Sequence, residues 1–381
     1  NEKWKLLLKS LIKMRILIVT DFSTPSLCGV WNRAYNDAKY LVSMGHDVHI
    51  FSSNIIKGAN QISQKYGEYE GIKIHRFKAI QFGENILFWK FKKNLIKLNP
   101  DIIHVHNYRH ICAHRALRYA KKINKPCYLT THAPFVNRKL RGILLNLLVS
   151  CYDFFFKKEL NDFEKVITIT RWEEPELLAL GLKKDKISYI PNVIPSDMFI
   201  ERPFAQIENP RLLFLGRIDP IKDIETLIRA VGRLDYLKLT IAGPYQEDYY
   251  RRLRNLVVSY GASHRIHFIG SVDNLRDKLK LLGEHDVLIL PSVREAMPQV
   301  LLEAMAAGLI VISSKTDGGK ELIQHGVTGY LFSIGDYLEL SNILTKLKTD
   351  STVMKNARLF AQQFKMDQLG DKLLNLYTNH S

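Results

Sequence analysis

Two glutamates in the second half of the chain are spaced as a pair that could bind a sugar. Glu295 and Glu303 are separated by seven residues in the stretch PSVREAMPQVLLEAMAAG, residues 291–308. Pro298 is a favourable first helical residue and Gly308 a favourable stop, so Glu295 is expected in a loop and Glu303 inside a helix. Because helical side chains lean toward the N-terminus of their helix, both carboxylates can face one cleft and accept hydrogen bonds from vicinal hydroxyls. The alternative is a capping acid followed by a solvated helical acid.

A pair of cations follows an apolar run in the stretch FLGRIDPIKDIETL, residues 214–227. Gly216 and Arg217 come directly after the run, and Lys222 follows five residues later. Two cations at the carboxyl end of a strand can bind a diphosphate, which arginine contacts through two parallel hydrogen bonds. They would also stabilise the charge of a departing diphosphate. The alternative is two ordinary surface cations.

Single residues in the first half could also approach a ligand. Gly29 precedes a helical pattern and would let a phosphate come close to the backbone, although a turn glycine explains it equally well. Since the stretch has one glycine and not G-x-G-x-x-G, a nicotinamide dinucleotide site is disfavoured. His132, in TTHAPF, could bond a sugar hydroxyl or stabilise positive charge through its own or a backbone carbonyl, but a lone histidine is usually structural. We interpret His104 and His106 as core or cleft lining and not metal ligands, because no third ligand has suitable spacing.

These residues require a scaffold that brings several strand ends together. Short apolar runs alternate with helical patterns and predict buried strands at 15–20, 47–53, 101–106, 126–132 and 165–170. The second half repeats the pattern at 211–216, 237–243, 265–270, 286–292 and 309–314. The alternation predicts an α/β fold of two doubly wound, Rossmann-like domains. Ligands of open parallel sheets bind beyond the carboxyl ends of the strands, and each motif above follows such a run.

The boundaries of the two domains follow from composition. Prolines and an asparagine in ISYIPNVIPSDMF, residues 187–199, indicate a linker. The predicted domains span 14–195 and 205–358. The first 13 residues, NEKWKLLLKSLIK, form a basic leader. Either Met14 is the true start, or the leader forms a short amphipathic helix that could contact a membrane; we favour a solvated leader.

Composition limits the classes of partner. The 381 residues carry a formal net charge of +17, which favours nucleotide phosphates, an anionic membrane or nucleic acid as partners, although a solvated basic surface gives the same charge. The four cysteines lie far apart, which disfavours a zinc site and indicates a reducing compartment. The apolar run at 142–156 contains Asn146 and Asp153 and falls short of the roughly 20 residues that span a bilayer. We therefore predict a cytoplasmic protein and leave peripheral membrane contact open.

Together these motifs resemble the retaining family 4 glycosyltransferases of GT-B fold, also described as glycosyl transferases group 1. The resemblance covers residues 14–378 and is strongest in LLFLGRIDPIKDIETLIRA (212–230) and DVLILPSVREAMPQVLLEAMAAGLIVISSKTDGGKELIQHGVTGYLF (286–332). It implies a nucleotide-diphosphate-sugar donor, no cofactor and no metal. It also implies that a C-terminal helix over 360–378 crosses back onto the first domain.

The resemblance assigns a role to each candidate residue. It implies that Glu303 binds the ribose and that Glu295 lies near the donor sugar. It implies a diphosphate clamp of Arg217 and Lys222, and a histidine near the transfer centre, His132. These last four are the expected catalytic residues: His132, Arg217, Lys222 and Glu295. Further donor contacts are implied at Gly29, Gly216, His267, Phe268, Ala296, Met297, Pro298, Gln299 and Val300, with His267 and Phe268 near the base.

The sequence departs from the family pattern at three places. Cys28-Gly29 replaces the frequent Gly-Gly pair, which puts amide contacts from Cys28 in doubt but not those from Gly29. The segment between the glutamates reads AMPQVLL and not the commoner GFGLVLL, so contacts that sense the shape of the sugar can differ. Asn192-Val193 replaces Asn-Gly in the linker, which we interpret as neutral.

The predicted reaction is sugar transfer with retention of configuration. A close carboxylate pair could suggest the mechanism of retaining glycosidases, but the resemblance assigns both glutamates to binding. We therefore predict front-face attack through an oxocarbenium-like state, in which the leaving diphosphate oxygen helps to take the acceptor proton.

Two alternative functions and the acceptor remain open. One alternative is a nucleotide-sugar epimerase of the same fold. The other is a non-catalytic basic protein that binds a membrane or nucleic acid, although the specific donor-site residues argue against nucleic acid. The segment 138–158, RKLRGILLNLLVSCYDFFFKK, could rest on a membrane and admit a lipid-linked acceptor, or it is an ordinary core helix. Neither the sugar nor the base follows from the sequence.

Overall fold

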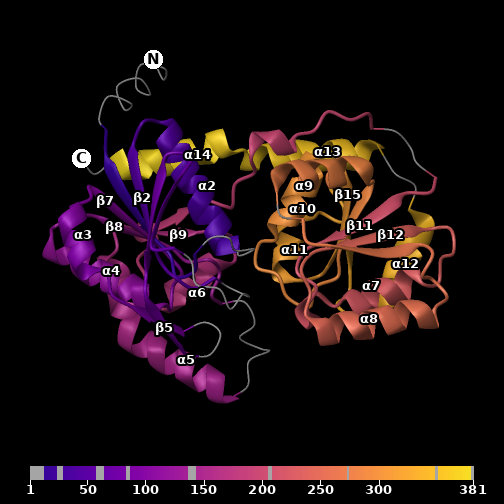
Figure 1. Ribbon diagram of the computed structural model, residues 1–381, viewed down its shortest axis with the longest axis horizontal. Helices are drawn as coiled ribbons and strands as arrows, with labels where there is room; N and C mark the ends of the chain where they lie inside the picture. Colours follow the sequence, from indigo (N-terminus) through magenta and orange to yellow (C-terminus); the bar gives the residue numbers. More distant parts are fainter. Residues whose placement is uncertain are drawn as a thin grey trace. The chain divides into compact units, whose positions relative to one another are not determined.

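The computed structural model describes residues 13–23, 29–56, 64–82, 86–135, 143–204, 208–272, 274–347 and 351–378. The leader up to residue 12, Cys28 and the segment 136–142 lie outside the described residues. The chain divides into two compact units, which are considered separately below (Figure 1). Unit 1 comprises Asn1–Val193 and Met366–Ser381, and unit 2 comprises Ile194–Lys365.

Unit 1 is built on an eight-stranded sheet of order β10-β9-β8-β7-β1-β2-β4-β3. Its strands are β1 (Arg15–Val19), β2 (Asp47–Ser53), β3 (Tyr66–Tyr69), β4 (Ile72–Phe77), β7 (Ile102–His106), β8 (Cys127–Thr130), β9 (Lys165–Thr168) and β10 (Ile187–Tyr189). All neighbours pair in parallel except β3, which runs antiparallel to β4. The central strands are continuous apolar runs because helices cover both of their faces. A separate antiparallel pair consists of β5 (Ala79–Phe82) and β6 (Ile86–Trp89).

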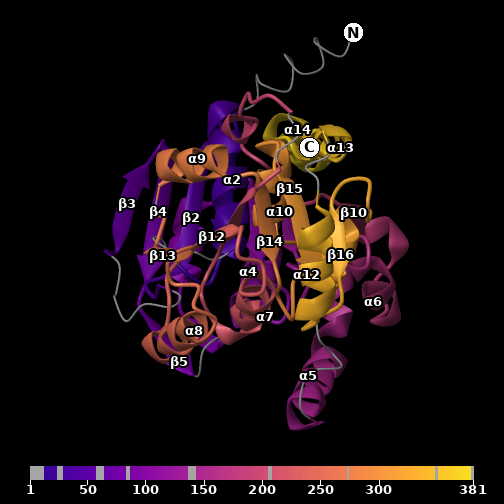
Figure 2. The ribbon, with the colours of Figure 1, turned by 90° about the vertical axis from the view of Figure 1, so that its right-hand side faces the viewer.

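Helices lie on both faces of this sheet (Figures 1 and 2). They are α2 (Gly29–Ser43), α3 (Lys92–Leu98), α4 (Ile111–Lys122), α5 (Ile143–Phe156), α6 (Glu173–Ala179) and α14 (Met366–Thr378). The expected helix over 360–378 is interrupted: α13 of unit 2 ends at Ala361, a 3-10 turn follows, and α14 begins at Met366. Of the helices in the described residues, none is long and apolar enough to cross a bilayer.

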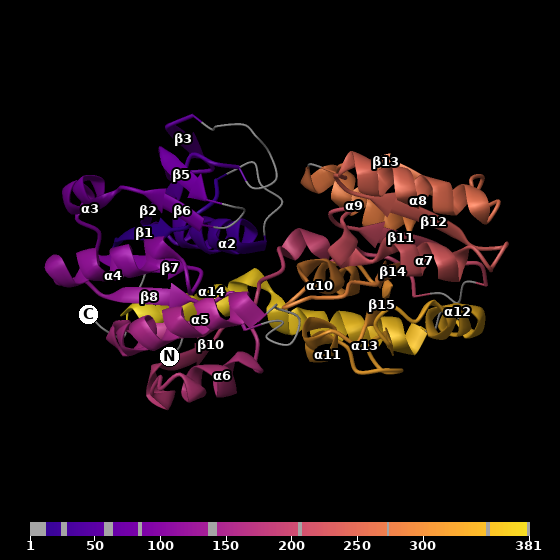
Figure 3. The same ribbon diagram turned by 90° about the horizontal axis from the view of Figure 1, so that it is seen from below.

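Helix α14 is part of the core of unit 1 although it comes last in the chain (Figure 3). A Cβ on Gly370 would lie 2.5 Å from the Tyr40 ring of α2, so the two helices touch where α14 has no side chain. The fully buried Tyr377 bonds through its hydroxyl to His104 Nδ1 of β7 at 2.7 Å. Tyr128 of β8 donates to the Leu376 carbonyl at 2.9 Å. The last helix therefore covers β7 and β8.

Unit 2 contains a six-stranded parallel sheet of order β13-β12-β11-β14-β15-β16. The strands are β11 (Arg211–Leu215), β12 (Lys238–Ala242), β13 (Ile266–Gly270), β14 (Val287–Leu290), β15 (Ile310–Ser314) and β16 (Tyr330–Phe332). The helices are α7 (Ile224–Val231), α8 (Glu247–Ser259), α9 (Leu275–Glu284), α10 (Gln299–Ala306), α11 (Asp317–Leu322), α12 (Tyr337–Lys346) and α13 (Ser351–Ala361). Figure 1 shows α9, α10 and α13 on one side of the strands and α7 and α8 on the other.

Both sheets change direction at one point, and this determines where ligands can bind. In unit 1 the chain winds outward from β1 through β2 and then returns to place β7 on the other side of β1. In unit 2 it winds from β11 through β12 and β13 and returns to place β14 beside β11. The predicted α/β class with two doubly wound, Rossmann-like units is confirmed. Crevices at such switch points are the usual ligand sites of this architecture.

Candidate active site

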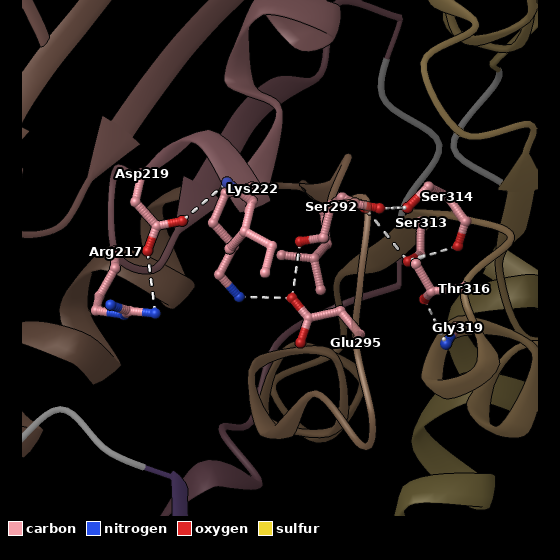
Figure 4. A network of polar contacts seen from close by, with 11 residues as sticks. Arg217, Asp219, Lys222, Ser292, Glu295, Ser313, Ser314, Thr316 and Gly319 are labelled. Atoms are coloured by element: carbon pink, nitrogen blue, oxygen red, sulfur yellow. Dashed lines mark hydrogen bonds and ion pairs between the residues drawn. The ribbon is translucent and has the colours of Figure 1, made fainter. Parts of the chain in front are cut away.

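The candidate site of unit 2 begins in the loop that follows β11. A side chain on Gly243, whose φ is 147°, would place its Cβ 1.8 Å from the Gly216 carbonyl oxygen, so glycine is required for these strand ends to approach. Asp219 orders the loop, because its carboxylate accepts a hydrogen bond from the Ile221 amide at 3.1 Å. The same side chain pairs with Arg217 Nη2 at 3.0 Å (Figure 4). The loop therefore presents a half-exposed guanidinium beyond the end of β11.

Lys222 joins this loop to the one that follows β14 (Figure 4). Its Nζ donates to Glu295 Oε1 at 2.5 Å, and Ser292 Oγ donates to the same oxygen at 2.7 Å. The Val293 amide also donates to the Ile221 carbonyl at 2.9 Å. The side chains of Lys222 and Glu295 are only 18% and 12% exposed, so water screens the ion pair weakly. The two strand ends at the switch point of unit 2 thus share a compact cation–carboxylate pair.

Glu303 forms a second pair with a lysine. Its Oε2 lies 2.6 Å from Lys278 Nζ of α9, and the glutamate side chain is 13% exposed. Both parts of the alternative interpretation, a capping acid followed by a solvated helical acid, are therefore wrong. Glu303 is not a solvated acid, and Pro298, not Glu295, occupies the N-cap position of α10, without a side-chain capping bond. Sequence analysis missed Lys278, since nothing in its spacing connects it with α10.

The backbone of residues 296–300 separates the two glutamates. Pro298 has no amide hydrogen, so the expected amide contacts from this segment cannot include that residue. The Gly318 amide donates to the Glu295 carbonyl at 2.9 Å. A Cβ on Gly318 would lie 2.7 Å from the Ala296 carbonyl oxygen, which explains why a glycine stands at this position.

A third loop, which follows β15, completes this polar network (Figure 4). Ser314 Oγ donates to the Ser292 carbonyl at 2.5 Å. Thr316 accepts a bond from the Gly319 amide at 3.0 Å and so caps α11. Sequence analysis missed the two serines, although both lie at the ends of predicted strands.

Two predicted base-contacting residues lie apart from this network. His267 and Phe268 belong to the edge strand β13, and the Phe268 ring packs edge-on against Tyr250 of α8 with centroids 5.1 Å apart. Together with Arg254 they line a hollow between α8 and β13. Among the described residues, no hydrogen bond or ion pair connects them with Arg217, Lys222 or Glu295.

Unit 1 holds the remaining predicted residues, Gly29 and His132. Gly29 is the first residue of α2, and a Cβ added there would meet no atom within 4 Å. His132 follows β8 with φ 58°, and Ala133 after it has φ 52°, a left-handed conformation that costs energy in residues other than glycine. His132 Nε2 lies 2.8 Å from His106 Nδ1. Burial lowers the pKa of His132 well below its ordinary value, and the nearby Arg33 charge adds to this, so the ring is neutral.

A buried glutamate, which sequence analysis missed, holds the loop of His132. Glu173, at the start of α6, is fully buried and accepts hydrogen bonds from the Ala133 amide at 2.8 Å and the Ile169 amide at 2.9 Å. The Thr131 hydroxyl also donates to this carboxylate. These bonds stabilise the left-handed backbone of the loop.

The statement that His104 and His106 lack a third ligand is wrong. Asp37 of α2 lies with them, and one ligand atom of each residue falls within 4.8 Å of the others. However, Asp37 accepts two bonds from Arg33 Nε at 2.8 and 2.9 Å. His104 bonds to Thr130 as well as Tyr377. A fully buried guanidinium beside the cluster opposes a dication, so these contacts favour a polar core network.

Comparison with known proteins assigns the chain to a family. The description "Glycosyltransferase Family 4" matches residues 28–197, and "Glycosyl transferases group 1" matches residues 199–364. The chain belongs to the family 4, group 1 glycosyltransferases. Its predicted membership and its predicted activity in glycosyl transfer are therefore confirmed. Each family description covers most of one structural unit.

The names of two relatives agree with the assignment to the glycosyltransferases. The chain is 24% identical over 355 residues to the N-acetyl-alpha-D-glucosaminyl L-malate synthase of Bacillus anthracis, covering 89% of this chain and 90% of that protein. It is 25% identical over 357 residues to the phosphatidylinositol N-acetylglucosaminyltransferase gpi3 subunit of Schizosaccharomyces pombe, covering 88% of this chain and 75% of that subunit.

Two solved structures share the fold of this glycosyltransferase. Anabaena Alr3699/HepE in complex with UDP and glucose superposes with a TM-score of 0.73 and 19% identity, over 96% of this chain and 100% of that one. Sucrose-phosphate synthase from Thermosynechococcus elongatus gives a TM-score of 0.76 and 20% identity, over 97% and 99% of the two chains. At these identities the likeness concerns the fold alone, and it confirms the GT-B class.

Proposed function

We propose that the chain transfers a sugar from a nucleotide-diphosphate-sugar to a hydroxyl-bearing acceptor, with retention of configuration and without a metal ion. The Lys222–Glu295 pair at the switch point of unit 2, with Arg217 beside it, carries this proposal. The relatives support the donor class, since HepE was solved with UDP-glucose and the Bacillus anthracis relative is named for glucosaminyl transfer.

The two cations are suited to a diphosphate. An acidic side chain orients each of them, and each still has N–H groups that can donate to a ligand. Arg217 is held by Asp219 through one nitrogen, and a guanidinium has five N–H groups. Lys222 donates to Glu295, and an ammonium group has three. The remaining donors can bind the diphosphate and stabilise the charge that grows as it leaves. Two cations at this position would neutralise the negative charge of the leaving diphosphate, as a bound metal ion does in other transferases.

Glu295 is better suited to binding than to nucleophilic attack. Its Oε1 accepts hydrogen bonds from both Lys222 and Ser292, which engage the lone pairs that a nucleophilic oxygen would need. We assign it to donor-sugar hydroxyls, and we assign front-face attack to the acceptor oxygen. In that step the bond from the anomeric carbon to the diphosphate breaks and the bond to the acceptor oxygen forms. The acceptor proton passes to the leaving diphosphate oxygen.

Glu303 has a free acceptor atom for the ribose. Lys278 engages Oε2, so Oε1 is available to a ribose hydroxyl. His132, which is neutral and held in an unusual backbone conformation, is assigned to a sugar hydroxyl near the transfer centre. We assign Gly29 and Gly216 to close approach of the donor phosphates, and His267 and Phe268 to the base.

Helix α5 supports a membrane-associated acceptor. Leu147, Phe154 and Phe155 are 59%, 68% and 71% exposed and recur at helical spacing, while Tyr152 and Asp153 face the core. Lys157 Nζ lies 5.6 Å from the Phe154 ring, so a cation borders the apolar stripe. We propose that this face rests peripherally on an anionic bilayer, as an amphipathic interfacial helix does. The gpi3 relative is named for a phosphatidylinositol substrate, which favours a lipid-linked acceptor.

The test begins with donor binding. Thermal shifts with UDP, UDP-glucose and UDP-N-acetylglucosamine should identify the donor, and mass spectrometry should then detect a glycosylated acceptor. L-malate and phosphatidylinositol vesicles are the first acceptors to offer. An isomerised nucleotide-sugar without a glycosylated product would show an epimerase and overturn the proposal. EDTA should leave the rate unchanged; loss of activity that a divalent cation restores would overturn the metal-free step.

A further inference from the structure

The switch point of unit 1 carries an acid–imidazole pair that the donor chemistry does not use. Asp21 follows β1 by two residues, and His110 immediately precedes α4 after β7. The Asp21 carboxylate and His110 Nδ1 are hydrogen-bonded. Because β1 and β7 are the two strands that flank the change of direction, this pair occupies the position where an open parallel sheet normally binds its ligand.

The hydrogen bond to Asp21 determines which nitrogen of the His110 ring carries the proton. Asp21 is 1% exposed, and its Oδ1 also accepts a bond from Trp89 Nε1 at 2.9 Å. Burial and the Asp21 charge raise the pKa of the Cys112 thiol well above its ordinary value, so that neighbour stays neutral. A carboxylate can only accept hydrogen bonds, so Nδ1 of the neutral ring carries the proton. Nε2 is then the acceptor atom of His110.

The outer edge of the His110 ring is available to a ligand. The His110 side chain is 21% exposed, although its partner Asp21 is buried. Among the described residues, no group bonds to His110 Nε2. The adjacent strand end, that of β8, presents His132. Strands β1, β7 and β8 are neighbours in the sheet, so Asp21, His110 and His132 follow the ends of three adjacent strands.

The loop that carries His110 is held in a strained conformation. Asn107 and Arg109 have φ of 77° and 68°, and with His132 and Ala133 they account for four of the eight non-glycine residues with positive φ in the described parts of the chain. Arg109 secures the loop through bonds to Asp153, 2.9 Å from Nε and 2.6 Å from Nη2. Strain of this kind persists where the surrounding structure fixes a functional geometry.

We propose that His110 binds the acceptor, with Nε2 accepting a hydrogen bond from an acceptor hydroxyl, and that Asp21 is the positioning residue that keeps Nε2 unprotonated. The inference rests on the proposed function. His110 takes no proton in the transfer, since the attacking hydroxyl gives its proton to the leaving diphosphate oxygen. The acceptor class is therefore a hydroxyl compound, with a hydroxyl that reaches the end of β7.

Three variants of His110 and Asp21 separate acceptor binding from a structural role. In His110→Asn the amide nitrogen can replace Nδ1 as donor to Asp21, but nothing replaces Nε2. In His110→Gln the amide lies near the former Nε2 position and can still accept a bond. Asp21→Asn can donate to Nδ1, which would move the ring proton to Nε2 and turn the acceptor into a donor. Trp89→Phe is the matched control, because it removes the indole donor to Asp21 and leaves His110 intact.

The experiment compares these variants with the wild-type chain by release of UDP from UDP-glucose and UDP-N-acetylglucosamine. L-malate, phosphatidylinositol vesicles and glycerol are offered separately, and the ratio of glycosylated acceptor to free sugar is measured by mass spectrometry. His110→Asn and Asp21→Asn should lower that ratio, or raise the acceptor KM, roughly three- to tenfold, with His110→Gln less affected. UDP affinity by calorimetry should not change in any of them.

The outcomes distinguish the inference from the function on which it rests. If His110→Asn keeps the wild-type ratio and KM, or if Trp89→Phe lowers them as much, His110 has only a structural role and the inference is overturned. If the wild-type chain neither binds UDP nor turns over either UDP-sugar, the proposed function fails, and the inference fails with it. A lower ratio with unchanged UDP affinity supports both.

Discussion

The switch points of the two units use the same topology for different chemistry. In unit 2, strand ends β11 and β14 join Lys222 to Glu295, a charged pair with Arg217 nearby. In unit 1, strand ends β1 and β7 join Asp21 to His110, a buried acid with a ring that can accept a hydrogen bond. The first arrangement suits a ligand with large negative charge, and the second suits an uncharged hydroxyl. If the proposed roles are correct, side chains at the switch point, and not the winding of the sheet, determine what each unit binds.

The largest effect should come from the cations of unit 2. Arg217→Ala and Lys222→Ala should each lower turnover about 100- to 1000-fold, because each removes a charge that stabilises the departing diphosphate. Donor affinity, measured by calorimetry, should fall less than the rate. Lys320→Ala, a surface lysine in the same unit that is 57% exposed, is the control and should behave as wild type. A loss confined to KM would mean ordinary ground-state binding.

The two units should also respond differently to acid. Burial lowers the pKa of His104 from an ordinary value of 6.5 to about 3, and it also lowers the pKa of His106 well below that ordinary value. The unfolded chain then binds protons that the folded unit 1 does not, so stability present above pH 6.5 is lost as the pH falls below it. Each histidine contributes about 1.4 kcal/mol per pH unit in this window.

Thermal unfolding between pH 7 and 5 tests this difference. As the pH falls, unit 1 should lose stability at a higher pH than unit 2. In unit 2, His285 is the one described histidine with a lowered pKa. His104→Gln should flatten the dependence of unit 1 on pH. A single transition whose pH dependence is unchanged in the variant would contradict the assignment of acid sensitivity to this cluster.

A smaller effect is expected at the ribose contact. Glu303→Ala should weaken nucleotide-sugar binding by about 1.5–3 kcal/mol, ten- to hundredfold, since a charged hydrogen-bond acceptor is lost. The chain should stay folded in circular dichroism. Glu303→Gln keeps the shape of the side chain and should bind with intermediate affinity. Unchanged affinity in calorimetry would refute the assignment.

The smallest effect concerns the exposed face of α5. Flotation with anionic vesicles should recover the protein at low salt, and neutral vesicles should recover little, because each basic residue near the surface contributes about 1 kcal/mol that salt screens. The double variant Phe154→Ser, Phe155→Ser should reduce the floated fraction. Leu359→Ser is the control, since Leu359 is a 64% exposed apolar residue of unit 2. Equal flotation of the two variants would argue against α5 as the contact.

The elements and part of the site could be predicted from the sequence. The buried strands are continuous β-branched runs, and their parallel ends meet, so Arg217, Lys222 and Glu295 were expected near one another. The strands β3 to β6, of four to six residues each, were not predicted, because β3 is largely exposed and β4 alternates Ile72 and Ile74 with polar residues where the predicted strands are continuous apolar runs. The interruption before α14 was also missed, since the helical pattern continues through it.

The unpredicted contacts join elements that are distant in the sequence. Asp21 and His110 are 89 residues apart, and His104 and Tyr377 are 273 apart. Local spacing contains no information on such pairs, because they depend on the order of strands and on helix packing. Lys278 and Asp37 were missed for the same reason: each lies on a helix whose pattern explains it as an ordinary surface or core position.

The return of the chain to unit 1 has a consequence for biosynthesis. Tyr377 and Leu376 of α14 complete contacts with β7 and β8, so unit 1 lacks part of its core until α14 is made. Unit 2 is a continuous segment, Ile194–Lys365, and all of it precedes α14. Domains usually fold from the N-terminus as they leave the ribosome. In this chain unit 2, which is translated after most of unit 1, can fold first, while unit 1 keeps an incomplete face until α14 has been made.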